Sequence, residues 1–131
     1  MNLDYEIEGK KIVITECSFG KASKLKDAVA KMIVKNEFDL KTFFGLFDEE
    51  NNEIGFNDVI RLVLQLDTNE ACHAALVDCL LDSTIDGNKI LKEQILADDF
   101  IKRQYYRLIK DVFLVNIVPF IESLASLLSV Q

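Results

Sequence analysis

The longest periodic stretch of this chain covers residues 98–128, and it limits the folds open to the sequence more than any other feature. Apolar residues recur every three or four positions in DDFIKRQYYRLIKDVFLVNIVPFIESLASLL, which places them on one stripe of a helix. Asp98 precedes this run as an N-cap residue does, and its carboxylate lies at the positive end of the helix dipole. The sequence therefore predicts a single long helix over residues 98–129.

The second half of this helix has no charged face. Residues 112–121 carry no charge, and only Asn116 and Pro119 among them are not apolar. A helix that is apolar on every side has to be covered on every side, by its own domain or by another chain. Pro119 lacks the amide that would bond to the carbonyl of Val115, so we expect the helix to bend there, with the Asn116 side chain offered to the loosened backbone.

Two arrangements satisfy this requirement. In the first, the segment forms the core of the domain together with a helix at residues 18–36. In the second, it makes a surface that binds a partner or a second copy of the chain. The residues expected to contact a partner in that case are Tyr105, Val112, Phe113, Val115, Asn116, Pro119 and Phe120.

Length and composition predict one domain with a substantial core. The chain has 131 residues, of which 50% are hydrophobic. Its most apolar run, residues 112–130, is interrupted by Glu122 and three serines, so we expect no membrane span. The N-terminal MNLDYEIEGKK is acidic where a signal peptide is basic, which predicts an intracellular protein. Cys17, Cys72 and Cys79 have no metal-binding spacing and are expected to be reduced core residues.

The net charge of -7 is concentrated in the middle of the chain. Residues 42–97 hold eleven acidic side chains against three basic ones, whereas the two ends are close to neutral. Nucleic-acid binding needs clustered positive charge that displaces counterions. The acidic middle therefore argues against a nucleic-acid partner, and it is typical of a surface that favours solubility.

The first half of the chain is predicted to form a hairpin, a helix and an aromatic segment. Residues 1–16 contain two strands joined by a type II′ turn at Gly9-Lys10. Residues 18–36 form an amphipathic helix with Ser18 near its start. The irregular segment 37–56 holds five of the nine phenylalanines and two turns of helix from Leu40. We expect these aromatic side chains to cover the core; the alternative is an arm that inserts into a partner.

Residues 57–96 are predicted to form short helices followed by a turn. Asn57 or Asp58 caps the first helix, and Thr68 or Asn69 caps the next. The only histidine, His73, lies at the edge of an apolar helix face with no second ligand and no nucleophile motif near it in sequence. The sequence thus predicts a protein that is not an enzyme and has no cofactor.

The segment DSTIDGNKILKE, residues 82–93, fits two structures. Its aspartates, glycine and glutamate match an EF-hand calcium loop, but the third position is the neutral Thr84, and Lys89 stands where such loops carry an apolar residue. The other structure is a small hairpin at residues 83–90 that turns at Asp86-Gly87, a favoured type I′ pair. The sequence favours the hairpin, keeps calcium binding as the alternative, and predicts no other metal site.

These segments add up to a mainly α (α+β) fold with a single domain over residues 1–131. It contains about five helices, an N-terminal hairpin packed on them, and a long bent C-terminal helix. The surface offers sites for binding rather than residues for chemistry.

The order of the segments resembles the tail assembly chaperones of long-tailed, siphovirus-type bacteriophages of Gram-positive hosts. The resemblance covers most of the chain outside residues 37–56. It rests on SFGKASKLKDAVAK, on a helix ending near CLLDSTIDGNKI, on the Tyr105-Tyr106 pair, and on the stretch from Val115-Asn116 to Pro119-Phe120.

The resemblance implies a protein that acts by binding. Such chaperones hold the tape measure protein in solution and help to recruit tail tube protein subunits around it. They work in the cytoplasm of the infected bacterium, are absent from the mature virion, and are often also made in a longer frameshifted form. Two other functions remain open from the residues alone: a small cytosolic adaptor or inhibitor of another protein, and a calcium-binding module.

Overall fold

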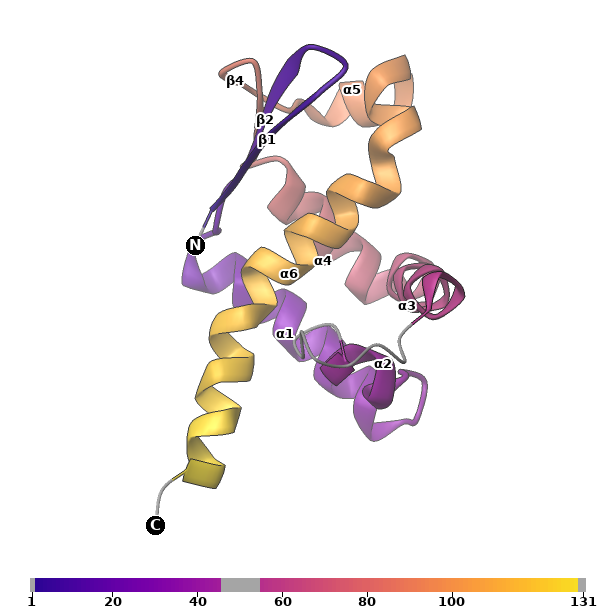
Figure 1. The fold of residues 1–131 in the computed structure, drawn as a ribbon, viewed down its shortest axis with the longest axis vertical. Helices are drawn as coiled ribbons and strands as arrows, with labels where there is room; N and C mark the ends of the chain where they lie inside the picture. The colour runs from indigo at the N-terminus through magenta and orange to yellow at the C-terminus, as the bar shows by residue number, and fades with distance from the viewer. Residues whose placement is uncertain (1, 46–54, 130–131) are drawn as a thin grey trace.

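The computed structural model describes residues 2–45 and 55–129, and it is mainly α-helical (Figure 1). In chain order its elements are β1 (Leu3–Ile7), β2 (Lys10–Ile14), α1 (Phe19–Val34), α2 (Leu40–Gly45), α3 (Phe56–Thr68), α4 (Glu70–Leu80), β3 (Thr84–Ile85), β4 (Asn88–Lys89), α5 (Lys92–Ala97) and α6 (Asp99–Ser129). The predicted class, a mainly α domain with an N-terminal hairpin and a long C-terminal helix, is confirmed. Six helices lie in the described residues, against about five expected. The two turns predicted from Leu40 form α2, and the short helix α5 is the additional one.

The first hairpin forms as predicted, but its turn lies one residue earlier. Ile7 of β1 pairs with Lys10 of β2, so the two-residue loop is Glu8-Gly9. Both loop residues have positive φ, 51° for Glu8 and 80° for Gly9, which defines a type I′ turn. The predicted type II′ turn at Gly9-Lys10 is therefore wrong, because Lys10 already belongs to the strand.

The second hairpin turns at Asp86-Gly87, as the sequence predicts. Asp86 has a φ of 52° and Gly87 a φ of 83°, again the type I′ pattern. β3 pairs with β2, so the two hairpins share one antiparallel sheet in the order β1-β2-β3-β4. The Asp86 amide donates to the carbonyl of Lys11 over 2.8 Å, and its carboxylate accepts from the Lys11 amide over 2.8 Å. These two hydrogen bonds join residues 75 positions apart and hold the turn against β2.

Side-chain caps fix the start of three helices where the sequence predicts them. Ser18 Oγ accepts from the third residue of α1 over 3.5 Å, Asn69 Oδ1 accepts from the Cys72 amide over 3.0 Å, and Asp98 Oδ1 accepts from the Ile101 amide over 3.0 Å. The expected cap of α3 at Asn57 or Asp58 is wrong. That helix begins at Phe56, and the Asp58 carboxylate instead reaches back to the amide of Gly55 over 3.1 Å.

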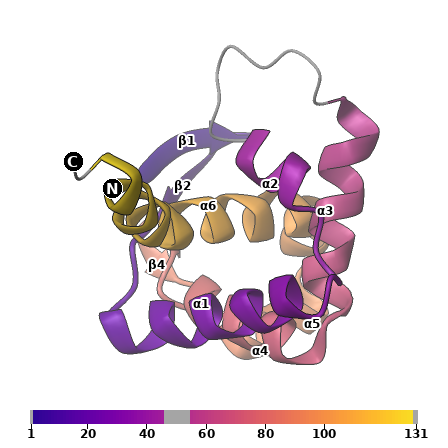
Figure 2. The ribbon, with the colours of Figure 1, turned by 90° about the horizontal axis from the view of Figure 1, so that it is seen from below.

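The long helix α6 runs through the centre of the molecule. Figure 2 shows it with α1 and α4 on one side and the hairpin of β1 and β2 with α2 on the other. α4 packs against both α1 and α6, and β2 also contacts α6. The helix is continuous through Pro119, and Figure 1 shows that it curves as it descends through the domain.

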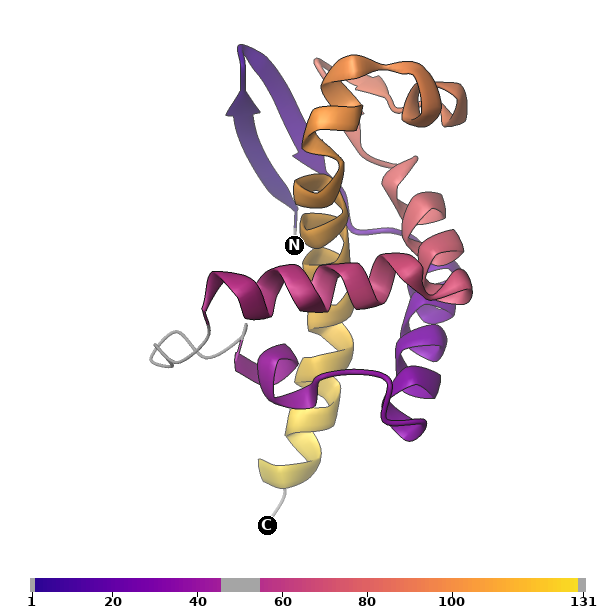
Figure 3. The same cartoon turned by 90° about the vertical axis from the view of Figure 1, so that its right-hand side faces the viewer.

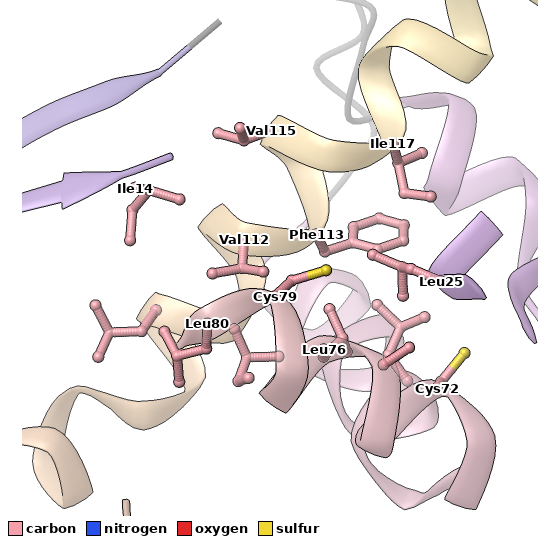
Figure 4. Close-up of a cluster of buried hydrophobic side chains, with 14 of the residues drawn as sticks. Ile14, Leu25, Cys72, Leu76, Cys79, Leu80, Val112, Phe113, Val115 and Ile117 are labelled. Atoms are coloured by element: carbon pink, nitrogen blue, oxygen red, sulfur yellow. The ribbon is translucent and has the colours of Figure 1, made fainter. Parts of the chain in front are cut away.

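The core is built where these elements meet (Figure 4). Its largest fully buried side chains come from β2, α1, α3, α4 and α6: Ile12, Ile14, Leu25, Leu62, Leu66, Leu76, Leu80, Ile101, Leu108, Ile109, Val112 and Phe113. Each such side chain stabilises the fold by about 1.5–3 kcal/mol relative to an exposed one. The first of the two arrangements, in which residues 112–121 form the core, therefore holds for the buried part of that segment.

Two phenylalanines of the aromatic segment cover the core. Phe38 and Phe43 are both buried, with ring centroids 5.1 Å apart in an edge-to-face contact. Phe43 in turn contacts Phe113 of α6 at 5.8 Å. Phe47 and most of the polar loop that follows lie outside the described residues.

Candidate partner-binding surface

Most of the residues predicted to contact a partner lie in the core. Val112, Phe113, Val115 and Asn116 are each no more than 1% exposed. Figure 4 shows the first three side chains in the buried cluster, with Val112 and Phe113 next to Cys79 of α4. These four residues do not form a surface in the described chain, so the partner-contact prediction for them is replaced by a structural role.

Asn116 has a structural role that differs from the one expected. Its Nδ2 donates to the carbonyl of Val112 over 2.8 Å, one turn back, and not to the carbonyl of Val115 that Pro119 leaves without its usual donor. Its Oδ1 accepts from the amide of Cys17 over 2.8 Å. Asn116 therefore satisfies a backbone amide between β2 and α1, 99 residues away in sequence, and anchors that connection to α6.

Pro119 and Phe120 lie on the outer side of α6. Pro119 is exposed, and Phe120 is half-buried beside the exposed Phe19 of α1, with ring centroids 6.0 Å apart. The Lys26 ammonium lies 5.6 Å from the Phe120 ring centroid. The predicted partner residues are thus divided between the core and two separate surfaces.

Tyr105 lies on the second surface, where it joins a polar network. Its hydroxyl donates to Asp67 Oδ1 over 2.8 Å, and His73 Nδ1 lies 2.9 Å from the same oxygen. The three side chains come from α6, α3 and α4. The His73 side chain is 49% exposed. The network orients Tyr105 by hydrogen bonds that hold three helices together.

Two hollows open beside this network, and both border Tyr106. The first, of about 510 Å³, is lined by Asp67, His73, Val77, Lys92, Ile95, Leu96, Lys102, Tyr105 and Tyr106. The second, of about 440 Å³, is lined by Val59, Ile60, Val63, Leu64, Tyr106, Arg107 and Lys110. We call the two hollows together the Tyr106 groove. Figure 3 views the helices that supply these residues, with α3 across the middle, α5 above it and α6 running vertically.

The Tyr106 groove exposes large apolar side chains. Leu96 is 89% exposed, Tyr106 50%, Leu64 42% and Ile60 40%. Scattered single apolar residues are normal on a surface, but these four come from three helices and line two hollows that both border Tyr106. The groove is therefore the strongest candidate for a binding surface in the described residues.

Sequence reasoning located Tyr105 but missed most of the groove. The apolar spacing of α3 predicts one stripe through Val59, Leu62, Val63 and Leu66. The last three are buried, whereas Val59 is half-buried and lines the second hollow. Ile60 and Leu64 are apolar residues outside that stripe, and this excess on one helix was the available signal. No comparable signal exists for Leu96, since α5 has only six residues.

The candidate calcium loop forms a hairpin in which its aspartates have other partners. Asp82 accepts from Lys21 Nζ over 3.0 Å, and Asp86 binds the backbone of Lys11. The hydrogen bond to Asp82 raises the pKa of Lys21. Within the residues that the structure describes, no three His, Cys, Asp or Glu side chains gather as a metal site would require.

The three cysteines are free and lie where core residues are expected. Cys72 and Cys79 are buried, and Cys17 is half-buried. Burial raises the pKa of Cys72 to about 11, and the hydrogen bond with Cys79, together with burial, raises the pKa of Cys17. The Cys17 and Cys72 thiols therefore stay protonated at neutral pH, which makes them poor nucleophiles. The hydrogen bond with Cys17 instead lowers the pKa of Cys79.

Two tyrosines should make the fold sensitive to alkaline pH. Burial, reinforced by the hydrogen bond to Asp67, raises the pKa of Tyr105, and burial with a 2.6 Å hydrogen bond to Asp111 raises that of Tyr5. A phenol with a raised pKa in the folded chain stabilises the fold fully below its unfolded pKa of about 10, and this stabilisation is lost as the pH rises. We therefore expect the melting temperature to fall above about pH 10, and to fall less steeply in Tyr5→Phe/Tyr105→Phe. Thermal melts between about pH 9 and 11 test this; equal slopes in both proteins would refute it.

Comparisons with protein-family models, with curated proteins and with solved structures find no match to this chain. None of the helices in the described part of the chain is both long enough and apolar enough to cross a bilayer.

Proposed function

We propose that this chain is a non-enzymatic tail assembly chaperone of a long-tailed bacteriophage, which binds the tape measure protein through the Tyr106 groove. The observation that carries the proposal is the groove itself, an apolar depression between α3, α5 and α6 with exposed Ile60, Leu64, Leu96 and Tyr106. A tape measure protein is a long, largely helical chain that needs its apolar stripes covered before the tail forms. Binding a helix in an apolar groove is the ordinary way to cover such a stripe.

The groove is already formed in the free chain, which supports a role in binding. Its apolar side chains are partly exposed in the free chain, so a client can cover them without unfolding any element. Its polar network of Asp67, His73 and Tyr105 is satisfied internally and holds the three helices in register. A preformed surface of this kind lowers the entropic cost of association.

The proposal includes the place and time of action that the resemblance implies. The chaperone holds its client in the cytoplasm of the infected host, helps to recruit tail tube subunits, and leaves before the virion is complete. A small adaptor or inhibitor that binds a helix of another protein is the alternative, since the same groove would serve it.

Co-expression with the tape measure protein of the same genome tests the proposal. We expect the client to remain soluble and to elute with several copies of this chain, because covered apolar stripes no longer aggregate. Size-exclusion chromatography with light scattering measures the stoichiometry. If the client precipitates as it does when expressed alone, the tail-chaperone role is wrong and the adaptor alternative is preferred.

A further inference from the structure

The Tyr106 groove has a basic border on a chain whose net charge is -7. Lys92 and Lys102 line the first hollow, and Arg107 and Lys110 line the second. Three of these four cations come from α6, on the side of the helix that faces away from the core.

Two of the four cations, Lys92 and Lys102, have neither a carboxylate nor an aromatic ring as a partner among the described residues. Arg107 lies 4.6 Å over the ring of Tyr5, and Lys110 Nζ lies 3.7 Å from the Asp111 carboxylate. Lys92 and Lys102 are exposed, and no acidic side chain among the described residues lies within ion-pair distance of either. Their charges are available to a ligand in the first hollow.

The one carboxylate in the lining of the groove does not cancel this charge. Asp67 is 16% exposed at its side chain, and one of its oxygens accepts from Tyr105 while lying 2.9 Å from His73 Nδ1. Its charge is directed into the network between the helices. The charge that the groove presents outward is therefore positive.

We propose that the groove selects amphipathic client helices whose apolar stripe is flanked by Asp and Glu. The apolar floor, with Leu96 and Tyr106, takes the stripe, and Lys92 and Lys102 pair with the flanking carboxylates. This inference rests on the proposed function and adds the chemistry of the client segment. A helix flanked by lysines meets like charges at the same border, which the groove disfavours.

Two synthetic peptides test the proposal with the full chain. They share one helical apolar stripe and carry either Glu or Lys at the flanking positions, and their binding is measured by fluorescence anisotropy at low and high salt. We expect the Glu peptide to bind about fivefold to tenfold more tightly at low salt, from two exposed pairs of up to about 1 kcal/mol each, with the preference shrinking as salt screens them. Lys92→Glu/Lys102→Glu should remove or invert the preference. Lys89→Glu, an exposed lysine on β4 outside the groove, should leave it unchanged.

The results distinguish a failure of the charge selection from a failure of the proposed client-binding function. Equal affinity for the two peptides, both lost in Tyr106→Ala, would overturn the charge selection and keep the groove as the binding site. Binding of neither peptide, or binding unaffected by Tyr106→Ala, would overturn the groove and the inference together. A change of oligomeric state in Lys92→Glu/Lys102→Glu by sedimentation would mean that a second copy of the chain occupies the groove, which also overturns the inference.

Discussion

Phe113→Ala is expected to lower the free energy of unfolding by about 3–5 kcal/mol. Phe113 is 1% exposed and its ring contacts Phe43 at 5.8 Å, so its removal leaves a cavity between α6 and the aromatic segment. A domain of this size is commonly stable by only about 5–15 kcal/mol, so the variant should be close to unfolding at growth temperature. Urea denaturation followed by circular dichroism measures the change.

Phe19→Ala is the matched control, because it removes the same side chain from a surface. Phe19 is 77% exposed and its contact is with the half-buried Phe120. We expect its unfolding free energy to change by less than about 1 kcal/mol. Should Phe113→Ala prove as stable as Phe19→Ala, while binding a client poorly, Phe113 would be an interface residue and its place in the core would be wrong.

The features that depend on neighbouring residues could be predicted from the sequence. The long helix follows from apolar spacing and begins directly after Asp98, whose carboxylate caps the Ile101 amide. The Asp86-Gly87 turn follows from the conformational preferences of those two residues. The predicted position of the first turn was wrong by one residue, since the loop is Glu8-Gly9 and not Gly9-Lys10. The pairing register of the two strands, and not the glycine alone, decides which two residues form the loop.

Contacts between distant segments could not be predicted. The Asn116 side chain was expected to bond to the backbone of its own helix near Pro119, yet its amide oxygen accepts from the backbone amide of Cys17. In the same way, the Tyr5 hydroxyl donates to Asp111, 106 residues away in sequence. The joining of the two hairpins into one sheet is of the same kind. A single sequence contains no signal for such pairs, because each residue has an ordinary local explanation.

The candidate site was found only in part for the same reason. Val112, Phe113, Val115 and Asn116 were selected because the helix segment 112–121 is apolar on all sides. That property equally describes a helix at the centre of a domain, which is where α6 lies (Figure 2). Neither Leu96 nor Ile60 indicates a binding surface when it is considered alone in the sequence. They become a surface once α3 and α5 are packed beside Tyr106.

Tyr106→Ala is expected to weaken client binding by about 30-fold or more, which corresponds to about 2 kcal/mol. Tyr106 borders both hollows, and a half-exposed aromatic ring at the centre of an apolar surface is typical of residues that dominate binding energy. The stability of the fold should change little. The substitution removes the ring contact with Tyr105 at 5.2 Å, but it introduces alanine, which favours helix. Thermal melts verify that the variant is folded.

The most direct test of the account is the amount of tape measure protein that co-purifies with equal amounts of the wild-type chain, Tyr106→Ala and Phe19→Ala. If the Tyr106 groove is the client-binding surface, Phe19→Ala retains the client at the wild-type level and Tyr106→Ala loses nearly all of it while keeping its melting temperature. If Tyr106→Ala retains the client and Phe19→Ala loses it, the client binds beside Phe120 at the outer side of α6, and the central claim is wrong.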